Sequence, residues 1–404
     1  MEAPSRSLSP GVLVRLLGGG FALMASYGMV RPLSNALYSE LVGPENMFWA
    51  MALVPLVVTV VMFPYARLLS ATGPHRTLLF TTVASAVLLL VPILARGRGG
   101  AFGLYLWREA YIVLLVEQFW AFANSTMDRR AGKRVYGLLL VFGGLGAMAG
   151  NGLVTWLAEA VGSWTLLAAS TGCLLPFLWL MDGAHRRSRV DTGSAGPRGA
   201  GGGQGHLGFG LFRSHRNLGY LAVIIALGQL FSATMDVTFH VHLKEAFPDV
   251  DLRAAREATF WAAINGGSML LNLLAPALLA VFSLRRLHLL YPLGHLALAL
   301  VALLFPGFWT AAIALAWFKI VDYSLFRSSK ELLYIPLPFD ARYRTKMLID
   351  MVIYRVSKGS GALVLAALGV ATMGGGLGLP LIAACCAAGW AGCVPGLTRD
   401  EGSR

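Results

Sequence analysis

Charged residues concentrate in one stretch of this sequence, from Lys319 to Ala362, which reads KIVDYSLFRSSKELLYIPLPFDARYRTKMLIDMVIYRVSKGSGA. The stretch has the length and apolar content of two membrane-spanning helices. A charge at the centre of a lipid-facing helix costs roughly 2.5–3.5 kcal/mol, so several would cost roughly 10 kcal/mol, as much as a domain's stability. We therefore expect them to face a protein interior or a water-filled cavity. They are Lys319, Asp322, Arg327, Lys330, Glu331, Asp350, Arg355 and Lys358.

Helical spacing groups these charges into stripes. At about 100° per residue, Lys319, Asp322, Arg327 and Lys330 fall within an arc of roughly 140° on the first helix. The charges of the second helix span a similar arc. Two polar stripes with a basic excess at membrane depth are typical of the wall of an anion pathway. The predicted anion ligands are Lys330, Arg327, Arg355 and Lys358, and the predicted counter-charges are Asp322, Glu331 and Asp350.

Other ionisable residues lie alone inside apolar segments. Arg31, in YGMVRPLSNAL, is either a ligand for an anion or the partner of an acid on another helix, such as Glu117. Glu117 in turn is a proton site or, as we favour, a counter-charge. Asp236 has His240 one turn later, and the two either couple proton movement or form a structural hydrogen-bonded pair.

The composition defines the class of protein that must position these groups. The chain of 404 residues is 56% hydrophobic and 13% charged, with a mean hydropathy of +0.65. Soluble domains carry about twice that charge. Apolar runs of about 20 residues recur from end to end, which predicts a polytopic membrane protein. We expect about twelve spans, at 12–38, 46–69, 76–95, 101–125, 135–160, 163–182, 217–243, 257–282, 286–305, 309–333, 346–372 and 376–396.

The loops indicate orientation and a division into halves. Lys and Arg concentrate in the loops after every second span, which predicts that both termini are cytoplasmic in a bacterial-type inner membrane. The same rule explains the net charge of +13 without a nucleic-acid partner. A Gly-, Ser- and Arg-rich segment follows the sixth span. We therefore predict an N-terminal six-helix half at 1–182, a flexible cytoplasmic linker at 183–216 and a C-terminal half at 217–404.

Short matches between the halves suggest a repeat. Met47-Phe48-Trp49-Ala50 opens the second span and Thr259-Phe260-Trp261-Ala262 opens the eighth. Lys133 follows the fourth span as Lys346 follows the tenth, and at that offset Gly146 falls on Gly359. Together these matches favour an all-α fold of two six-helix pseudo-repeats, the architecture of major-facilitator transporters, with a substrate site near the midplane.

Catalytic and metal-binding patterns are not visible in the sequence. Ser, His and Cys occur outside the contexts that nucleophile elbows, zinc sites and redox pairs require. We therefore expect no enzyme activity, no metal and no cofactor. Gly143, Gly144, Gly146 and Gly150 are interpreted as close helix packing rather than as a phosphate cradle, because no strand precedes them.

The stretch KELLYIPLPFDARYRTKMLIDMVIYRVSKGSGA resembles the signature of the ATP/ADP translocase (nucleotide transporter) family of plastids and intracellular bacteria. That signature has a Lys-Glu-x-x-Tyr-Ile-Pro-Leu run, a Lys before Ala-x-Ile-Asp, and a Gly-Lys-Ser-Gly-Gly-like turn. AGKRVYGLLLVFG, DVTFHVHLKEAFPD and YGMVRPLSNAL resemble further motifs of the family, so the resemblance covers most of the chain. The residues that match the signature are Lys330, Glu331, Tyr334, Ile335, Pro336, Leu337, Lys346, Ile349, Asp350 and Lys358.

The resemblance implies that charged residues hold nucleotide phosphates during transport. Lys330 and Arg31 are kept, and Asp236 replaces a Glu. The departures are Ser34 and His240, each in place of a Lys, Asn35 in place of an Asp, and Ala131 in place of a Glu. The resemblance therefore implies a secondary transporter of nucleotides, of the ATP/ADP type, with fewer fixed cations than its relatives. The alternatives are a proton-coupled carrier of another small anionic solute, which would use Asp236 and His240, and a membrane protein that kept only the fold.

Overall fold

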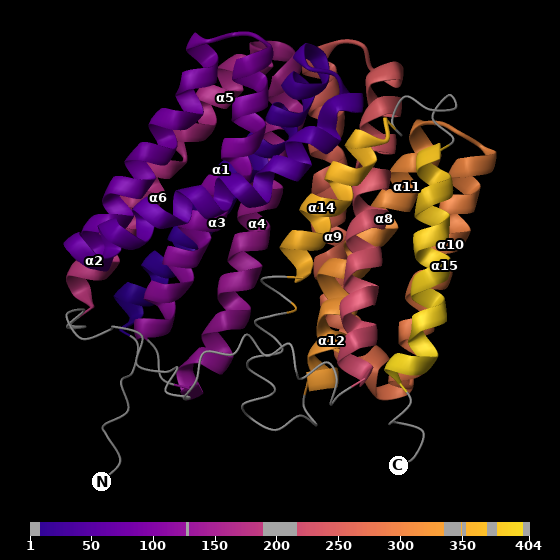
Figure 1. Cartoon of the computed structure of the whole chain (residues 1–404). Helices are drawn as coiled ribbons and strands as arrows, with labels where there is room; N and C mark the ends of the chain where they lie inside the picture. The colour runs from indigo at the N-terminus through magenta and orange to yellow at the C-terminus, as the bar shows by residue number, and fades with distance from the viewer. Residues whose placement is uncertain are drawn as a thin grey trace. The chain divides into compact units, whose positions relative to one another are not determined.

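The computed structural model describes residues 9–126, 129–188, 216–334, 349, 353–369 and 378–398, and nearly all of them are helical (Figure 1). Two short turns accompany the helices, the 3-10 turn Pro44–Asn46 and the π-helical turn Asp322–Phe326. The helices are α1 Pro10–Leu41, α2 Met47–Leu94, α3 Arg98–Thr126, α4 Arg129–Val161, α5 Ser163–Gly172, α6 Leu174–Arg187, α8 Arg216–Ala246, α9 Val250–Val281, α10 Leu284–Leu304, α11 Phe308–Val321, α12 Arg327–Tyr334, α14 Tyr354–Ala367 and α15 Gly378–Leu397.

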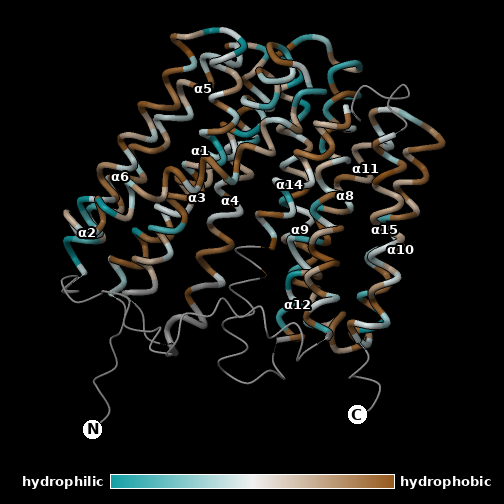
Figure 2. Tube along the Cα trace, in the orientation of Figure 1, coloured by the Kyte–Doolittle hydropathy of each residue, from teal (hydrophilic) through white to brown (hydrophobic). Residues whose placement is uncertain are grey.

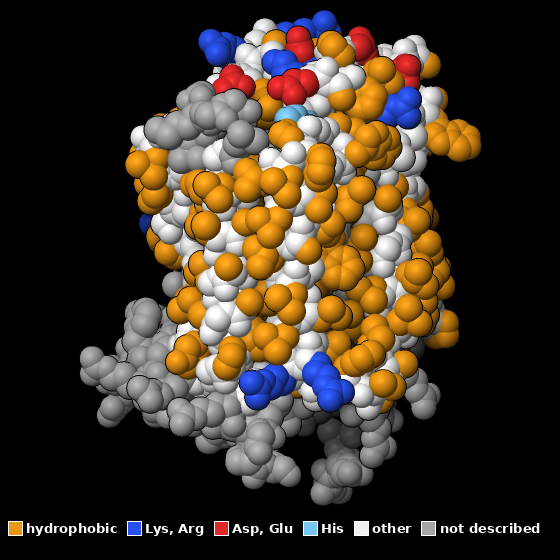
Figure 3. Space-filling view, turned by 90° about the vertical axis from the view of Figure 1, so that its right-hand side faces the viewer, with side chains coloured by type: hydrophobic (Ala, Val, Ile, Leu, Met, Phe, Trp, Pro, Cys, Tyr) orange, Lys and Arg blue, Asp and Glu red, His pale blue; other side chains and the backbone are white. Residues whose placement is uncertain are grey.

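Ten helical runs in these ranges are long and apolar enough to cross a membrane, which confirms the predicted all-helical membrane protein. Hydrophobic residues follow the helices along most of their length, and one face of the molecule carries a broad hydrophobic belt with charged groups above and below it (Figures 2 and 3). The predicted spans 46–69 and 76–95 share one run, Pro44–Leu94, that is interrupted at Gly73, whose φ of 76° favours glycine. Because the span 346–372 is described only at 349 and 353–369, the number twelve stays a prediction.

Helix α9 begins about two turns before the predicted start at 257. The side chain of Asp249 caps it, accepting hydrogen bonds from the backbone N–H groups of Asp251 (3.0 Å) and Leu252 (2.8 Å). The polar residues of these first turns lower the hydropathy that marks a span. Arg253 is nevertheless fully buried, so the added turns belong to the packed structure.

The chain forms two compact units. Unit 1 comprises residues 1–42, 56–199 and 247–266, and unit 2 comprises residues 43–55, 200–246 and 267–404. Helices α2 and α9 each run from one unit into the other. The predicted linker at 183–216 stays a prediction, because residues 189–215 lie outside the described ranges.

Within unit 1, α1 and α4 pack backbone to backbone. A Cβ atom at Gly146 or Gly150 would overlap the carbonyl oxygen of Phe21 or Ala25, and one at Gly28 would overlap that of Ala147. Glycines four residues apart allow two helices to approach this closely in a membrane. The interpretation of Gly146 and Gly150 as packing residues therefore agrees with their contacts.

Replacing Gly146 by leucine is expected to destabilise unit 1. The added side chain has no space against α1, and overpacking of this kind costs about 1–3 kcal/mol or more. We expect a clear fall in the thermal unfolding temperature of the purified protein. Gly152→Leu on the same helix is the matched control, because nothing lies within 4 Å of a Cβ atom there. Equal unfolding temperatures for both variants would contradict the close α1–α4 contact.

Candidate functional site

The predicted charge stripe lies on α11, the π-helical turn that follows it, and α12. A π turn changes the direction in which later side chains point, and such turns are frequent at functional sites. Ser324 in this turn donates a hydrogen bond to the backbone carbonyl of Ile320. Tyr291 of α10 donates a hydrogen bond of 3.4 Å to Ser329 of α12. The contact of Tyr291 with Ser329 holds α12 against α10 within unit 2.

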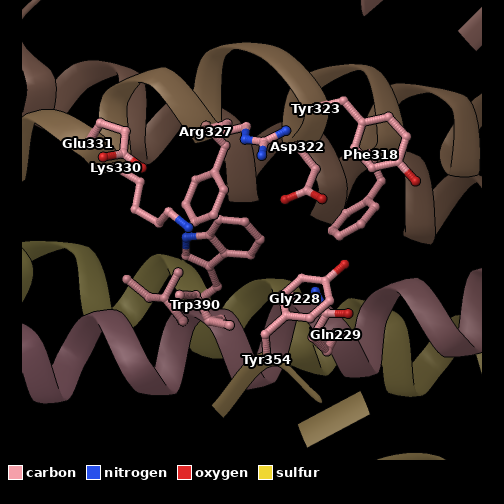
Figure 4. A pocket seen from close by; sticks show the side chains of 13 residues that line it. Gly228, Gln229, Phe318, Asp322, Tyr323, Arg327, Lys330, Glu331, Tyr354 and Trp390 are labelled. Carbon is pink, nitrogen blue, oxygen red and sulfur yellow. The ribbon is translucent and has the colours of Figure 1, made fainter. Parts of the chain in front are cut away.

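A pocket of about 340 Å³ opens beside this turn, within unit 2. Asp322 and Lys330 extend into it from α11–α12, and Gln229, Trp390 and Tyr354 lie opposite them (Figure 4). The volume lies within the range of small-molecule sites. The pocket is lined by Ile224, Ile225, Gly228, Gln229, Phe318, Asp322, Tyr323, Phe326, Arg327, Lys330, Glu331, Tyr354 and Trp390.

Charge in this pocket is balanced. The cations Arg327 and Lys330 and the carboxylates Asp322 and Glu331 all line it. Arg327 is exposed, whereas the other three side chains are half-buried. Without an anion, the two carboxylates offset the charge of the two cations. An anion that enters the pocket therefore competes with these carboxylates for the cations.

Lys319 belongs to the predicted stripe, but its side chain binds α8. Its Nζ lies 3.2 Å from Asp236 Oδ2 and donates a hydrogen bond of 2.8 Å to Ser232. Both charged residues are buried. A buried ion pair of this kind holds α11 against α8, because removing either partner leaves an uncompensated charge.

Unit 1 contains a comparable buried cation, Arg108 of α3, which is 3% exposed. Its guanidinium donates hydrogen bonds to Ser34 Oγ (2.8 Å) and Glu109 Oε1 (2.9 Å), and also to the side-chain oxygen of Asn35. Asn35 in turn donates to Glu257 of α9. Thus Ser34 and Asn35, two of the departures from the family pattern, lie around a buried arginine in unit 1.

Arg31 lies in the same region of unit 1. The guanidinium carbon of Arg31 is 3.2 Å from the centroid of the Trp261 ring, and Trp261 donates a hydrogen bond of 3.1 Å to Glu257. Nearby in sequence on α9, Arg253 forms an ion pair of 2.6 Å with Glu40. The side chain of Glu117, the alternative partner predicted for Arg31, is exposed on α3.

The remaining predicted residues are distributed as follows. The His240 Nδ1–H donates a hydrogen bond to the backbone carbonyl of Asp236 over 2.7 Å, so this contact does not involve the Asp236 carboxylate. Lys358 is half-buried on α14 and is absent from the pocket lining. Asp350 and the side chain of Arg355 lie outside the described residues.

Sequence reasoning missed several polar residues of these clusters. Arg108 and Glu257 lie inside or at the edge of predicted apolar spans. A charge in such a span could have identified them as candidates. Gln229 and Trp390 gave no such signal, because an uncharged amide and a tryptophan are ordinary in membrane helices. Only the packing of α8 and α15 around α11–α12 brings these two to the pocket.

Comparison with known families supports the resemblance found in the sequence. Residues 273–386 match the model of the TLC ATP/ADP transporter family. This segment contains α11, α12 and α14, and with them all the charged residues of the pocket. No curated protein matches the chain significantly in sequence.

Solved structures with a similar fold are transporters. A mutant of the nucleoside transporter NupG aligns with a TM-score of 0.72 and 10% identity, over 96% of this chain and 99% of its own. An autoinhibited POT family peptide transporter aligns with a TM-score of 0.66 and 15% identity, over 98% and 97%. A bacterial homologue of the human lysosomal transporter Spinster gives 0.55 and 14%, over 97% and 96%.

These likenesses show the fold, and the family match covers residues 273–386 of the chain. Both agree with the multi-pass helical structure and with the signature that begins at Lys330. The chain is therefore a multi-pass helical protein with the fold of these transporters, and its residues 273–386 match the TLC ATP/ADP transporter family.

Proposed function

We propose that this protein is a secondary transporter that moves a nucleotide, or a related phosphorylated anion, across the inner membrane by alternating access, with both termini cytoplasmic. One observation carries the proposal. The half-buried Lys330 and the exposed Arg327 line one pocket together with aromatic rings, inside the segment that matches an ATP/ADP transporter family. Cations bind phosphate and aromatic faces bind bases, so the pocket offers both halves of a nucleotide a partner.

In this proposal the carrier exchanges one anion for another. In the empty pocket, Asp322 and Glu331 offset the two cations. An entering phosphate competes with these carboxylates for Lys330 and Arg327. Arg31, Arg355 and Lys358, the other predicted anion ligands, are not among the described residues that line this pocket and stay predictions. The loaded carrier changes conformation, which gives counter-exchange with no covalent chemistry.

A proton-coupled carrier of another small anionic solute is the competing function. The buried pair of Asp236 and Lys319 is the observation in its favour, because a carboxylate inside a membrane helix is often part of a proton relay. In the proposed exchanger this pair is structural. The two functions predict different driving forces.

Uptake of labelled ATP into proteoliposomes separates them. Vesicles are preloaded with ADP or left empty, with and without an imposed pH gradient. We expect uptake only into preloaded vesicles, whatever the gradient. Uptake into empty vesicles that follows the pH gradient would favour the proton-coupled carrier. Absence of uptake in all vesicles, with folded protein, would contradict nucleotide transport.

Neutralising Asp322 is expected to tighten nucleotide binding. Asp322→Asn removes one of two carboxylates from the pocket, so the pocket's formal charge rises by one unit in favour of an anion. At an effective dielectric of about 20 this corresponds to about 1 kcal/mol or more, or a fall of about fivefold in the KM for ATP uptake. Glu245→Gln, an exposed carboxylate about 16 residues along α8 from the pocket, is the control. A raised KM in Asp322→Asn alone would contradict its role as a competing charge.

A further inference from the structure

Two nearly buried side chains with hydrogen-bonding groups line the pocket of unit 2. They are Gln229 on α8, which is 5% exposed, and Trp390 on α15, which is 2% exposed. The indole N–H of Trp390 has no hydrogen-bond partner in the described part of the chain. Buried polar groups in folded proteins are almost always hydrogen-bonded. A ligand in the pocket would offer both side chains a hydrogen-bond partner.

Flat aromatic surfaces lie next to these groups. The rings of Tyr354, Phe326 and Trp390 line the pocket, and Phe326 and Trp390 pack edge to face with ring centroids 5.1 Å apart. Any of the nucleobases can stack on an aromatic side chain, because every base has a π face. The same pocket carries Lys330 and Arg327, so a stacked base and a charged group on one molecule can both be held.

We propose that Gln229, Trp390 and Tyr354 form a subsite for the nucleobase of the transported nucleotide, in which Gln229 recognises the hydrogen-bonding edge of a purine. The inference rests on the proposed function and names its specificity-determining residue. An amide presents one donor and one acceptor side by side. This pair matches the amino group and adjacent ring nitrogen of adenine, as in the bidentate contacts of Gln with adenine in DNA complexes.

The chemistry of the amide gives the inference a directional test. A carboxylate at this position only accepts hydrogen bonds, so it repels the ring nitrogen of adenine. It matches the two neighbouring donors of guanine, N1–H and the amino group. Gln229→Glu is therefore expected to change the ratio of ATP to GTP affinity about tenfold or more in favour of GTP. Gln229→Leu removes recognition of both bases.

The experiment is equilibrium binding of labelled ATP to the purified full-length protein in lipid nanodiscs. The competitors are unlabelled ATP, GTP and inorganic tripolyphosphate, which has phosphates and no base. We expect Gln229→Leu to weaken the binding of ATP about tenfold and to leave the affinity for tripolyphosphate unchanged. Gln118→Leu is the matched control, because Gln118 is similarly buried but its amide binds Thr81 in unit 1. The control should keep the wild-type ATP to GTP ratio.

The outcomes separate this inference from the function on which it rests. An unchanged ATP to GTP ratio in Gln229→Glu, in protein that binds ATP, would overturn the base subsite and leave nucleotide binding standing. An equal loss of affinity for ATP and for tripolyphosphate in Gln229→Leu would also overturn the base subsite, because such a loss would indicate a general disturbance of the pocket. Wild-type protein that binds neither ATP nor tripolyphosphate would overturn the proposed function and this inference with it.

Discussion

Lys330→Gln is expected to lower kcat/KM for ATP uptake at least about tenfold, because a charge-assisted hydrogen bond to phosphate contributes about 1.5–3 kcal/mol. Lys330 is half-buried in the pocket, where its charge is screened less than that of the exposed Arg327. Removing it leaves Asp322 and Glu331 facing a single cation, so the pocket becomes net negative. A smaller loss is therefore expected in Arg327→Gln.

The measurement is the initial rate of labelled ATP uptake into ADP-loaded proteoliposomes over a range of ATP concentrations. Lys330→Arg keeps the charge and should recover part of the activity. Arg285→Gln, at an exposed arginine on the first turn of α10, should behave like the wild type. Wild-type kinetics in Lys330→Gln, with Arg327→Gln also unaffected, would contradict the placement of the phosphate site in this pocket.

The second large effect is expected at the ion pair of Lys319 and Asp236, which joins α11 to α8 at 3.2 Å. Breaking a buried pair by removing one partner costs about 3–5 kcal/mol, because the remaining charge stays buried. Lys319→Met and Asp236→Leu should each lower the thermal unfolding temperature strongly. The double variant should recover much of the loss, because no charge is then left without a partner.

Thermal unfolding of the wild type, the two single variants and the double variant in one detergent gives the coupling free energy between Lys319 and Asp236. If the losses of the single variants simply add in the double variant, the two residues do not form an energetically coupled pair. Asp236→Asn is informative about function as well. If wild-type transport followed a pH gradient and that of folded Asp236→Asn did not, Asp236 would be assigned to proton coupling and the exchange mechanism would be contradicted.

The sequence predicted the pocket's charged side better than its other walls. The helical spacing of Asp322, Arg327 and Lys330 placed them on one face, and all three line the pocket. Lys319 was predicted on the same face but binds Asp236. The π-helical turn after Val321 separates Lys319 from the others, and no residue type in the sequence signals such a turn.

Contacts between helices were the part that the sequence could not supply. The spacing within one helix does not reveal which other helix faces it, so Gln229 and Trp390 were not candidates. The contact of Arg31 with Trp261 of α9 was not predicted either, and its role as an anion ligand or as a partner of Glu117 stays a prediction. The polar first turns of α9 were also missed, because hydropathy alone does not register buried charges that have partners.

The most direct test of the account is to find where a nucleotide lies on the protein. Labelled 8-azido-ATP carries its reactive group on the base, so photolabelling followed by peptide mapping marks the residues near the base. We expect label on α14 and α15, at peptides that contain Tyr354 or Trp390, and loss of this label with excess ATP. Specific label confined to α1 or α3 in unit 1, with none on α14 or α15, would contradict the nucleotide site in unit 2.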